Sequence, residues 1–232
     1  GAVLSTGSNL DTSSVSLNAL TENLESSLAL FADVILNPAF PQAELDRLKQ
    51  EQLARIQREQ TTPIQMAQRV FPKLVFGEDH AYGQGLTGTG TIESVSDLTR
   101  SDLVDFVDSW FKPNNATLIV VGDTSLATLV PMLEEQFSNW SAGDIPVKNI
   151  SDVAQQQQSK IYIIDRPDSL QSVIYAGHVA PAVEDESEIA IGTMNNILGG
   201  SFTSRINMNL REDKGWSYGS RTIMIPTNSQ RP

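Results

Sequence analysis

Prolines divide the first third of the chain into separate helices, and their positions strongly constrain the fold. The segment TENLESSLALFADVILN, residues 21–37, places apolar side chains at helical spacing on one face. Pro38 ends this helix, because the residue before a proline avoids the helical backbone region. A second amphipathic helix restarts after Pro41 and a third begins near Pro63, and proline suits an early helix position. The sequence therefore predicts consecutive helices, each with one apolar face.

Charge and cysteine content exclude several classes of function. The chain carries 16 Lys and Arg against 28 Asp and Glu, a formal net charge of −12. Nucleic-acid binding needs a basic stripe that displaces counterions, and none is present. No apolar run is long enough to predict a membrane span. The absence of cysteine excludes disulfides, thiolate–zinc sites and cysteine nucleophiles, and it is compatible with a periplasmic or extracellular protein.

Strand and helix patterns alternate in the remainder of the first half. Thr99 is followed three residues later by Asp102, which is close to a capping box and predicts a helix over residues 99–111. The segment NATLIVVGD, residues 115–123, predicts a buried strand that ends in a turn at its last two residues. A further strand is predicted over residues 13–19 and a further helix over residues 125–140.

A second unit is predicted after a stretch of low apolar content. Residues 141–160 contain Gly, Pro, Ser and a glutamine run, which predicts a linker over residues 144–158 between residues 1–143 and residues 159–232. In the second unit we expect two strands joined by a turn at residues 166–169, a helix over 185–200, a helix over 201–214 that stops at Gly215, and a strand over 216–225. This order of elements predicts two similar α+β units.

Three long segments resemble the M16 metallopeptidases, the family of insulinase, pitrilysin and the mitochondrial processing peptidase. They are ADVILNPAFPQAELDRLKQEQLARIQRE, HAYGQGLTGTGTIESVSDLTRSDLVDFVDSWFKPNNATLIVVGD and NNILGGSFTSRINMNLREDKGWSYG, in family order. The resemblance implies an antiparallel sheet with helices packed on it, and it makes residues 1–143 the C-terminal part of one M16-like domain. Residues 159–232 become the N-terminal part of a second, homologous domain.

The resemblance also implies how such a protein works. Two M16 halves, fused or separate, close over a peptide. One half holds zinc through a His-x-x-Glu-His motif and a distant Glu, leaving an open position for water. The other half supplies an Arg and a Tyr that reach the substrate. For this chain the resemblance thus implies a peptide substrate and a zinc-bearing partner half.

The residues at the zinc-ligand positions indicate the zinc-less half. The two histidines, His80 and His178, lie 98 residues apart, and neither belongs to a His-x-x-Glu-His motif. Where catalytic members carry the third zinc ligand as a glutamate, QLARIQ places Arg55, and a guanidinium cannot ligate Zn²⁺. Glu51 and Glu59 lie one helical turn to either side, so a one-turn shift of register would restore a carboxylate ligand. We otherwise expect no metal or other cofactor in this chain.

The segment LREDKGWSYG carries the candidate site residues. The family's motif has an Arg and a Tyr at this spacing, which makes Arg211 and Tyr218 the matching positions. Gly215 is expected to end the helix, which leaves Arg211 on its last turn and Tyr218 at the start of the next strand. A guanidinium and a phenol both donate hydrogen bonds to a peptide carbonyl and to developing oxyanion charge. A helix-end arginine that favours the helix dipole, beside a packed tyrosine, is the structural alternative.

Three hypotheses follow from the sequence. The first is a fragment of the zinc-less half of an M16-type peptidase, inactive alone, in which Arg211 and Tyr218 position the peptide. The second is a non-catalytic assembly module of the same fold. The third is a zinc-bearing half whose His-x-x-Glu-His lies upstream of Gly1.

Overall fold

The structure, a computed structural model, describes all 232 residues of the chain. It divides into two compact units. The first contains Gly1–Arg58 and Thr89–Asn149, and the second contains Glu59–Gly88 and Ile150–Pro232. This division rests on contacts and not on homology, so the two M16-like domains expected from the sequence stay a prediction.

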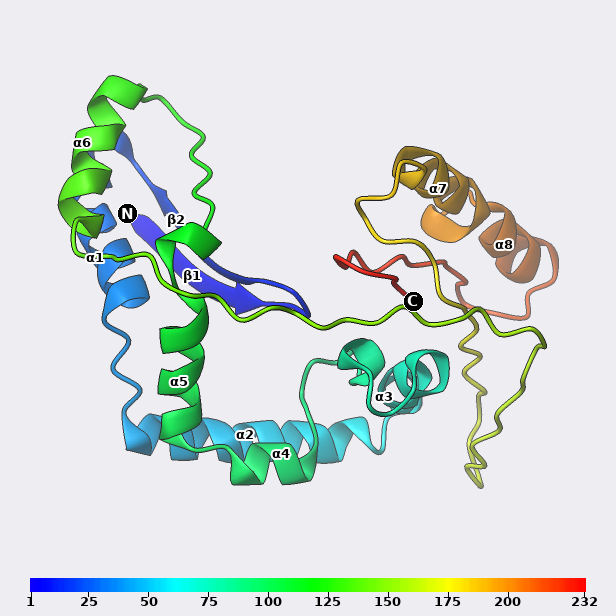
Figure 1. The fold of residues 1–232 in the computed structure, drawn as a ribbon. Coiled ribbons are helices and arrows are strands. Elements are labelled where there is room, and N and C mark those ends of the chain that lie inside the picture. The colour runs from blue at the N-terminus through cyan, green and yellow to red at the C-terminus, as the bar shows by residue number, and fades with distance from the viewer. The chain divides into compact units, whose positions relative to one another are not determined.

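The first unit begins with an antiparallel hairpin (Figure 1). Strands β1 (Ala2–Ser8) and β2 (Ser13–Ala19) pair in a continuous register from Ala2 opposite Ala19 to Ser8 opposite Ser13. The connecting turn is closed by Asn9, whose Oδ1 accepts hydrogen bonds from the backbone N–H groups of Asp11 and Thr12, at 2.9 and 2.8 Å. The strand predicted over residues 13–19 is confirmed.

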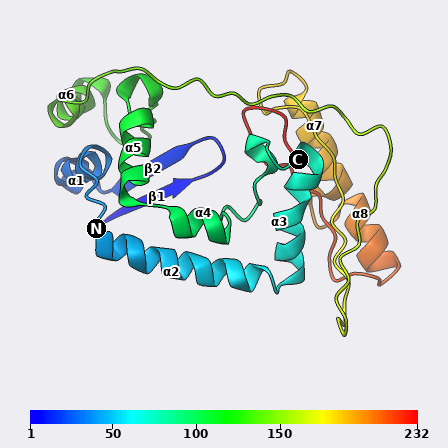
Figure 2. The same cartoon turned by 60° about the horizontal axis from the view of Figure 1, so that its bottom comes forward.

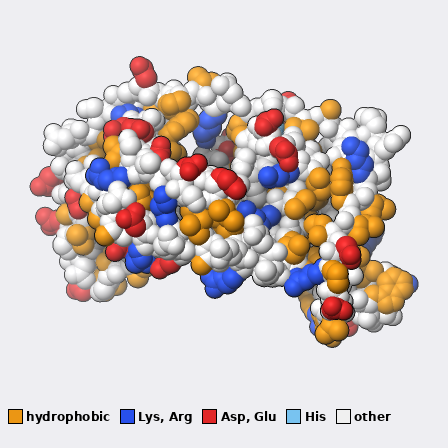
Figure 3. Space-filling view, turned by 90° about the horizontal axis from the view of Figure 1, so that it is seen from below, with side chains coloured by type: hydrophobic (Ala, Val, Ile, Leu, Met, Phe, Trp, Pro, Cys, Tyr) orange, Lys and Arg blue, Asp and Glu red, His pale blue; other side chains and the backbone are white.

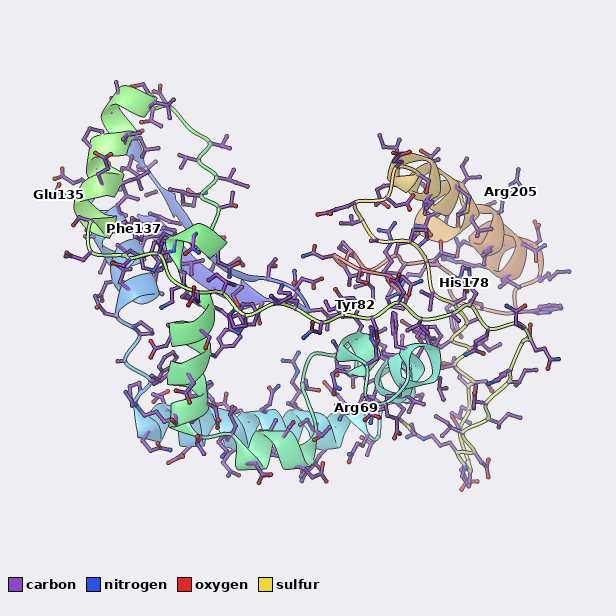
Figure 4. The ribbon with its side chains drawn as sticks, in the orientation of Figure 1. Arg69, Tyr82, Glu135, Phe137, His178 and Arg205 are labelled. Carbon is purple, nitrogen blue, oxygen red and sulfur yellow. The ribbon has the colours of Figure 1, made fainter.

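Helices cover one face of this hairpin. Leu28 and Phe31 of α1 (Leu24–Leu36) form a buried cluster with Leu129 of α6 (Leu126–Phe137). The rings of Phe31 and Phe137 meet edge to face with centroids 6.3 Å apart, and Figure 4 labels Phe137 on α6. Alternate residues of β2, Val15 and Leu17, pack against the same cluster. The apolar face predicted for residues 21–37 is therefore the face that builds this core.

The other helices of the first unit are held at their ends by polar groups. Helix α5 (Arg100–Trp110) starts with the predicted capping box, in which the side chains and backbone N–H groups of Thr99 and Asp102 bond reciprocally. Lys49 on α2 (Gln42–Glu59) donates to the carbonyl oxygens of Ser96 and Leu98, both at 2.7 Å, at the end of α4 (Ile92–Asp97) (Figure 2). Two 3₁₀ turns complete the unit, η1 (Thr21–Asn23) and η3 (Pro113–Asn115).

The second unit is built around α3 (Pro63–Phe76) and the 3₁₀ turn η2 (Ala81–Gly83). Pro72 lies inside α3, and because proline has no N–H, the carbonyl of Gln68 loses its helical donor. The N–H of Leu86 takes this place at 3.0 Å and so anchors the following loop to the helix. Phe76, Tyr82 and Val179 form the buried apolar cluster of the unit.

Two helical segments with wide turns follow. Helix α7 (Glu188–Asn195) continues as the π-helical turn η4 (Asn196–Gly200). Helix α8 (Arg205–Asn207) continues as the π-helical turn η5 (Met208–Asp213). The predicted helix ends at residue 200 and at Gly215 are confirmed, whereas the helices predicted over 185–200 and 201–214 begin later.

Three apolar segments predicted as strands form no ladder, and these predictions are wrong. The predicted buried strand over 115–123 is extended but exposed, with Ile119 at 81% and Val121 at 93% relative exposure. The segment over 160–180 contributes only an isolated bridge from Ala180 to Arg231, and the segment over 216–225 forms no bridge. The turn at residues 166–169 does form, through Ser169 N–H to Arg166 O at 3.3 Å. Hydrophobic side chains are accordingly visible on the molecular surface in Figure 3. The physical reason is that a strand needs backbone partners, which no other segment provides here.

Candidate substrate-positioning site

Arg211 lies in the last turn of η5, where a glycine cap ends the helix as predicted. Gly215 has φ = +62°, a left-handed conformation that costs glycine little because it has no Cβ. Its N–H donates to the carbonyl of Arg211 at 3.1 Å, and the N–H of Trp216 donates to the carbonyl of Leu210 at 2.9 Å. This is the double closure of a Schellman-type cap, widened by one residue by the π-helical turn.

The side chain of Arg211 is exposed but oriented by two neighbours. Its guanidinium lies 4.8 Å from the ring centroid of Phe202, and its Nε lies 3.3 Å from Oε1 of Glu212. The Arg211 side chain keeps 41% of its accessible surface. A guanidinium stacked on an aromatic ring retains in-plane N–H donors at its edge. The structure therefore presents a restrained cation with donors open to a ligand.

Tyr218 lies on a short turn that its neighbouring serine organises. The Ser217 hydroxyl donates to the carbonyl of Gly219 at 2.7 Å and accepts from the N–H of Gly219 at 3.0 Å. Tyr218 itself is 88% exposed. The expectation that Tyr218 follows the helix is confirmed, but it lies on a bend and not at the start of a strand.

The structure does not join Arg211 and Tyr218 directly. No hydrogen bond or ring contact links their side chains. The glycine cap and the Ser217 turn connect them through the backbone, and both side chains are accessible. The pair is thus available to a third molecule and is not consumed in an internal contact.

Close packing fixes the frame behind this segment. A Cβ added at Gly199 would lie 2.5 Å from Oγ1 and 2.6 Å from the backbone nitrogen of Thr222. The N–H of Thr222 also donates to the carbonyl of Gly199 at 3.0 Å. Only glycine permits this approach between η4 and the segment that follows Tyr218. The sequence predicts that a helix ends at residue 200, and it gives no signal for the contact of Gly199 with a residue 23 positions away.

The residues of α2 do not fit a zinc site. Arg55, at the expected ligand position, lies on an exposed part of the helix. The two alternative ligands are both engaged by arginines. Glu51 Oε1 accepts from Arg47 at 2.6 Å, and Glu59 Oε2, which is buried, pairs with Arg69 at 2.8 Å. No group of three or more His, Cys, Asp or Glu side chains is placed to hold a metal ion.

The two histidines have structural contacts. His80 Nδ1 accepts from the N–H of Tyr82 at 3.0 Å, and Nε2 donates to the carbonyl of Ser151 at 2.8 Å. These partners define the neutral tautomer that carries its proton on Nε2. The His80 ring stacks on Phe76 with centroids 5.0 Å apart. His178, labelled in Figure 4, contacts the carbonyl of Val179 through Nδ1 at 2.7 Å.

Comparison with known sequences identifies the family. The profile described as Peptidase M16 inactive domain matches residues 97–225, which is more than half of the chain. The chain therefore belongs to the peptidase M16 family and matches its inactive half.

No helix has the length and apolar composition that crossing a bilayer requires.

Individual relatives are similar over most of this chain. An uncharacterized zinc protease from Mycobacterium leprae is 25% identical over 202 residues, covering 87% of this chain and 45% of that protein. A non-peptidase homolog from Helicobacter pylori is 21% identical over 215 residues, covering 90% of this chain and 48% of that protein. The chain thus spans about half the length of these curated relatives.

Solved structures confirm the fold class. The peptidase M16 inactive domain from Pseudomonas fluorescens superposes with a TM-score of 0.83 at 23% identity, covering 99% of this chain and 55% of that one. A protease from Helicobacter pylori superposes with a TM-score of 0.81 at 17% identity, covering 100% and 56%. The α+β fold with M16-like architecture is thereby shown.

Proposed function

We propose that this chain is part of the zinc-less half of an M16-type peptidase, in which Arg211 and Tyr218 position a peptide for a zinc-bearing partner half. The observation that carries the proposal is that Arg211 and Tyr218 are both exposed to solvent while their backbone is ordered. Arg211 is restrained by Phe202 at 4.8 Å while its donors stay exposed, and Tyr218 stands on an ordered turn of the same segment. Unsatisfied donors on a fixed backbone suit the binding of a peptide carbonyl and of the oxyanion that develops during hydrolysis.

In this proposal the chemistry is divided between the two halves. The partner holds zinc, which supplies the activated water, and the present chain contributes only hydrogen-bond donors. The match to the peptidase M16 inactive domain supports this division. The zinc protease names of the relatives support zinc in the complete assembly. The chain alone is expected to hydrolyse no peptide.

The test is peptide cleavage by the full assembly with Arg211→Ala. Removal of one oxyanion donor costs about 3–4 kcal/mol in favourable cases, so kcat/KM should fall by ~100-fold or more with bound zinc unchanged. Arg205→Ala is the matched control, because Arg205 is an exposed arginine on α8 of the same helical segment (Figure 4). Equal cleavage by wild type and Arg211→Ala would contradict the proposal.

A non-catalytic assembly module is the second candidate function. The similarity to the non-peptidase homolog from Helicobacter pylori favours it. Under this alternative the wild-type assembly holds no zinc and cleaves no peptide, and Arg211→Ala leaves assembly with the partner intact.

A further inference from the structure

We infer that Asn207 is a positioning residue that fixes the Tyr218 turn to the support of Arg211. This inference rests on the proposed function of the Arg211 and Tyr218 pair. Asn207 ends α8 and is almost fully buried, at 4% relative exposure. Burying a side-chain amide costs free energy unless both its oxygen and its nitrogen are hydrogen-bonded. The two partners of the Asn207 amide therefore identify the segments that it joins.

The two ends of the Asn207 amide reach different parts of the site. Its Nδ2 donates to the carbonyl of Phe202 at 2.7 Å, and its Oδ1 accepts from the N–H of Ser220 at 3.0 Å. Because a carbonyl only accepts and an N–H only donates, these partners fix the orientation of the amide. One side chain therefore joins the loop before α8 to the turn after η5.

Phe202 contacts Arg211, and Ser220 belongs to the turn that carries Tyr218. The ring of Phe202 lies 4.8 Å from the Arg211 guanidinium. Ser220 closes the turn that carries Tyr218, and its Oγ lies 3.1 Å from Oγ of Ser217. Since Asn207 holds the Phe202 backbone and the Ser220 backbone, it sets the spacing between the two supports. The glycine cap before Tyr218 and the Thr222 contact with Gly199 after it hold the two ends of this segment, and the Asn207 side chain ties the turn itself to α8.

A backbone displacement of about 1 Å at a positioned group can cost ~100-fold in rate, so the loss of this tie should be measurable in catalysis. If Asn207 were replaced by an apolar residue, the Phe202 carbonyl and the Ser220 N–H would each lose the hydrogen bond that the amide makes. The expected effect is therefore a freed turn with an intact helix, because α8 and η5 keep their own backbone hydrogen bonds.

The first experiment measures amide hydrogen exchange of Ser220 in the full chain. Asn207→Leu should accelerate this exchange at least ~10-fold, because the N–H loses its buried acceptor. Asn207→Ala is a second variant for the case that leucine does not fit. Thr227→Val is the matched control, since Thr227 is equally buried and its hydroxyl bonds elsewhere, to the carbonyl of Ser229 at 2.9 Å. Unchanged exchange of Ser220 in a folded variant would overturn the inference.

The second experiment is a double-mutant cycle on peptide cleavage by the assembly. Asn207→Leu should lower kcat/KM by ~10–100-fold in the wild type but less than ~3-fold in the Tyr218→Phe background, because both changes remove the same positioned phenol. Equal losses in the two backgrounds would show a general structural role and overturn the inference. If Tyr218→Phe is itself silent while Ser220 exchange accelerates, the tie stands and the proposed function fails, so the two failures are distinguishable.

Discussion

The molecule contains two hairpin-like segments with opposite outcomes. Residues 2–19 are only weakly apolar, yet β1 and β2 pair along their whole length. Residues 160–175 are richer in isoleucine and have an ordered turn, yet their arms form no ladder, and Ile161 and Ile163 are 88% and 86% exposed. The difference is the packing of helices on the strands, here called cover. Helices α1 and α6 pack on β2, whereas no helix packs on Ile163 in the same way. Apolar content alone therefore does not make a strand, whereas a packed face does.

The largest effect on this comparison should come from removing the cover. Phe31→Ala deletes a buried ring that contacts Phe137, and such truncations cost about 3–5 kcal/mol. The free energy of unfolding from urea denaturation should fall by this amount, and the strand signal in circular dichroism should fall with it. A variant with unchanged stability would show that the hairpin does not depend on α1.

Two matched substitutions, each introducing a carboxylate, test whether β2 is packed against helices while residues 160–175 are not. Leu17→Asp places a partly buried carboxylate against the apolar cluster and should cost at least about 2 kcal/mol, because the charge loses water without gaining a partner. Ile163→Asp changes a side chain that is 86% exposed, and it should stay within about 0.5 kcal/mol of the wild type. Equal losses for both variants would contradict the difference in cover.

Close packing in the second unit gives the next prediction. Gly199→Ala forces a methyl group against the backbone nitrogen of Thr222, and overpacking of this kind costs about 1–3 kcal/mol. Gly192→Ala is the control, because the Cβ position at Gly192, on the same helical segment, meets nothing within 4 Å. Thermal denaturation should show a loss for Gly199→Ala only.

The smallest expected effect is a dependence of stability on pH at the capping box of α5. The hydrogen bonds from the side chain and then the backbone of Thr99 lower the pKa of Asp102 below its ordinary value of 3.8. A lowered folded-state pKa means that the ionised cap stabilises the fold above pH 3.8 and that this contribution fades as pH falls through the folded-state value. The stability difference between wild type and Asp102→Ala should therefore be constant near neutral pH and shrink in acid. A difference that grew in acid would contradict the sign.

The helices could be predicted from sequence because their signals are local. Thr99 with Asp102, the prolines, and Gly215 each act within one turn of chain, and the structure confirms them. The buried strand over 115–123 was predicted wrongly because its partners are set by tertiary structure. The positions of Arg211 and Tyr218 on either side of a glycine cap were predictable, but the buried amide of Asn207 was not. An asparagine within a helical pattern gives no sign that its partners are Phe202 and Ser220.

The proposed function has this chain assist peptide hydrolysis without performing it. Cleavage of a quenched fluorescent peptide library by the assembly of the present chain with the proposed zinc-bearing half tests this proposal. We predict no cleavage by this chain alone, cleavage by the assembly, and a loss of ~100-fold or more in kcat/KM when Arg211→Ala replaces the wild type at equal zinc content. Full activity with Arg211→Ala, or with the partner alone, would contradict it.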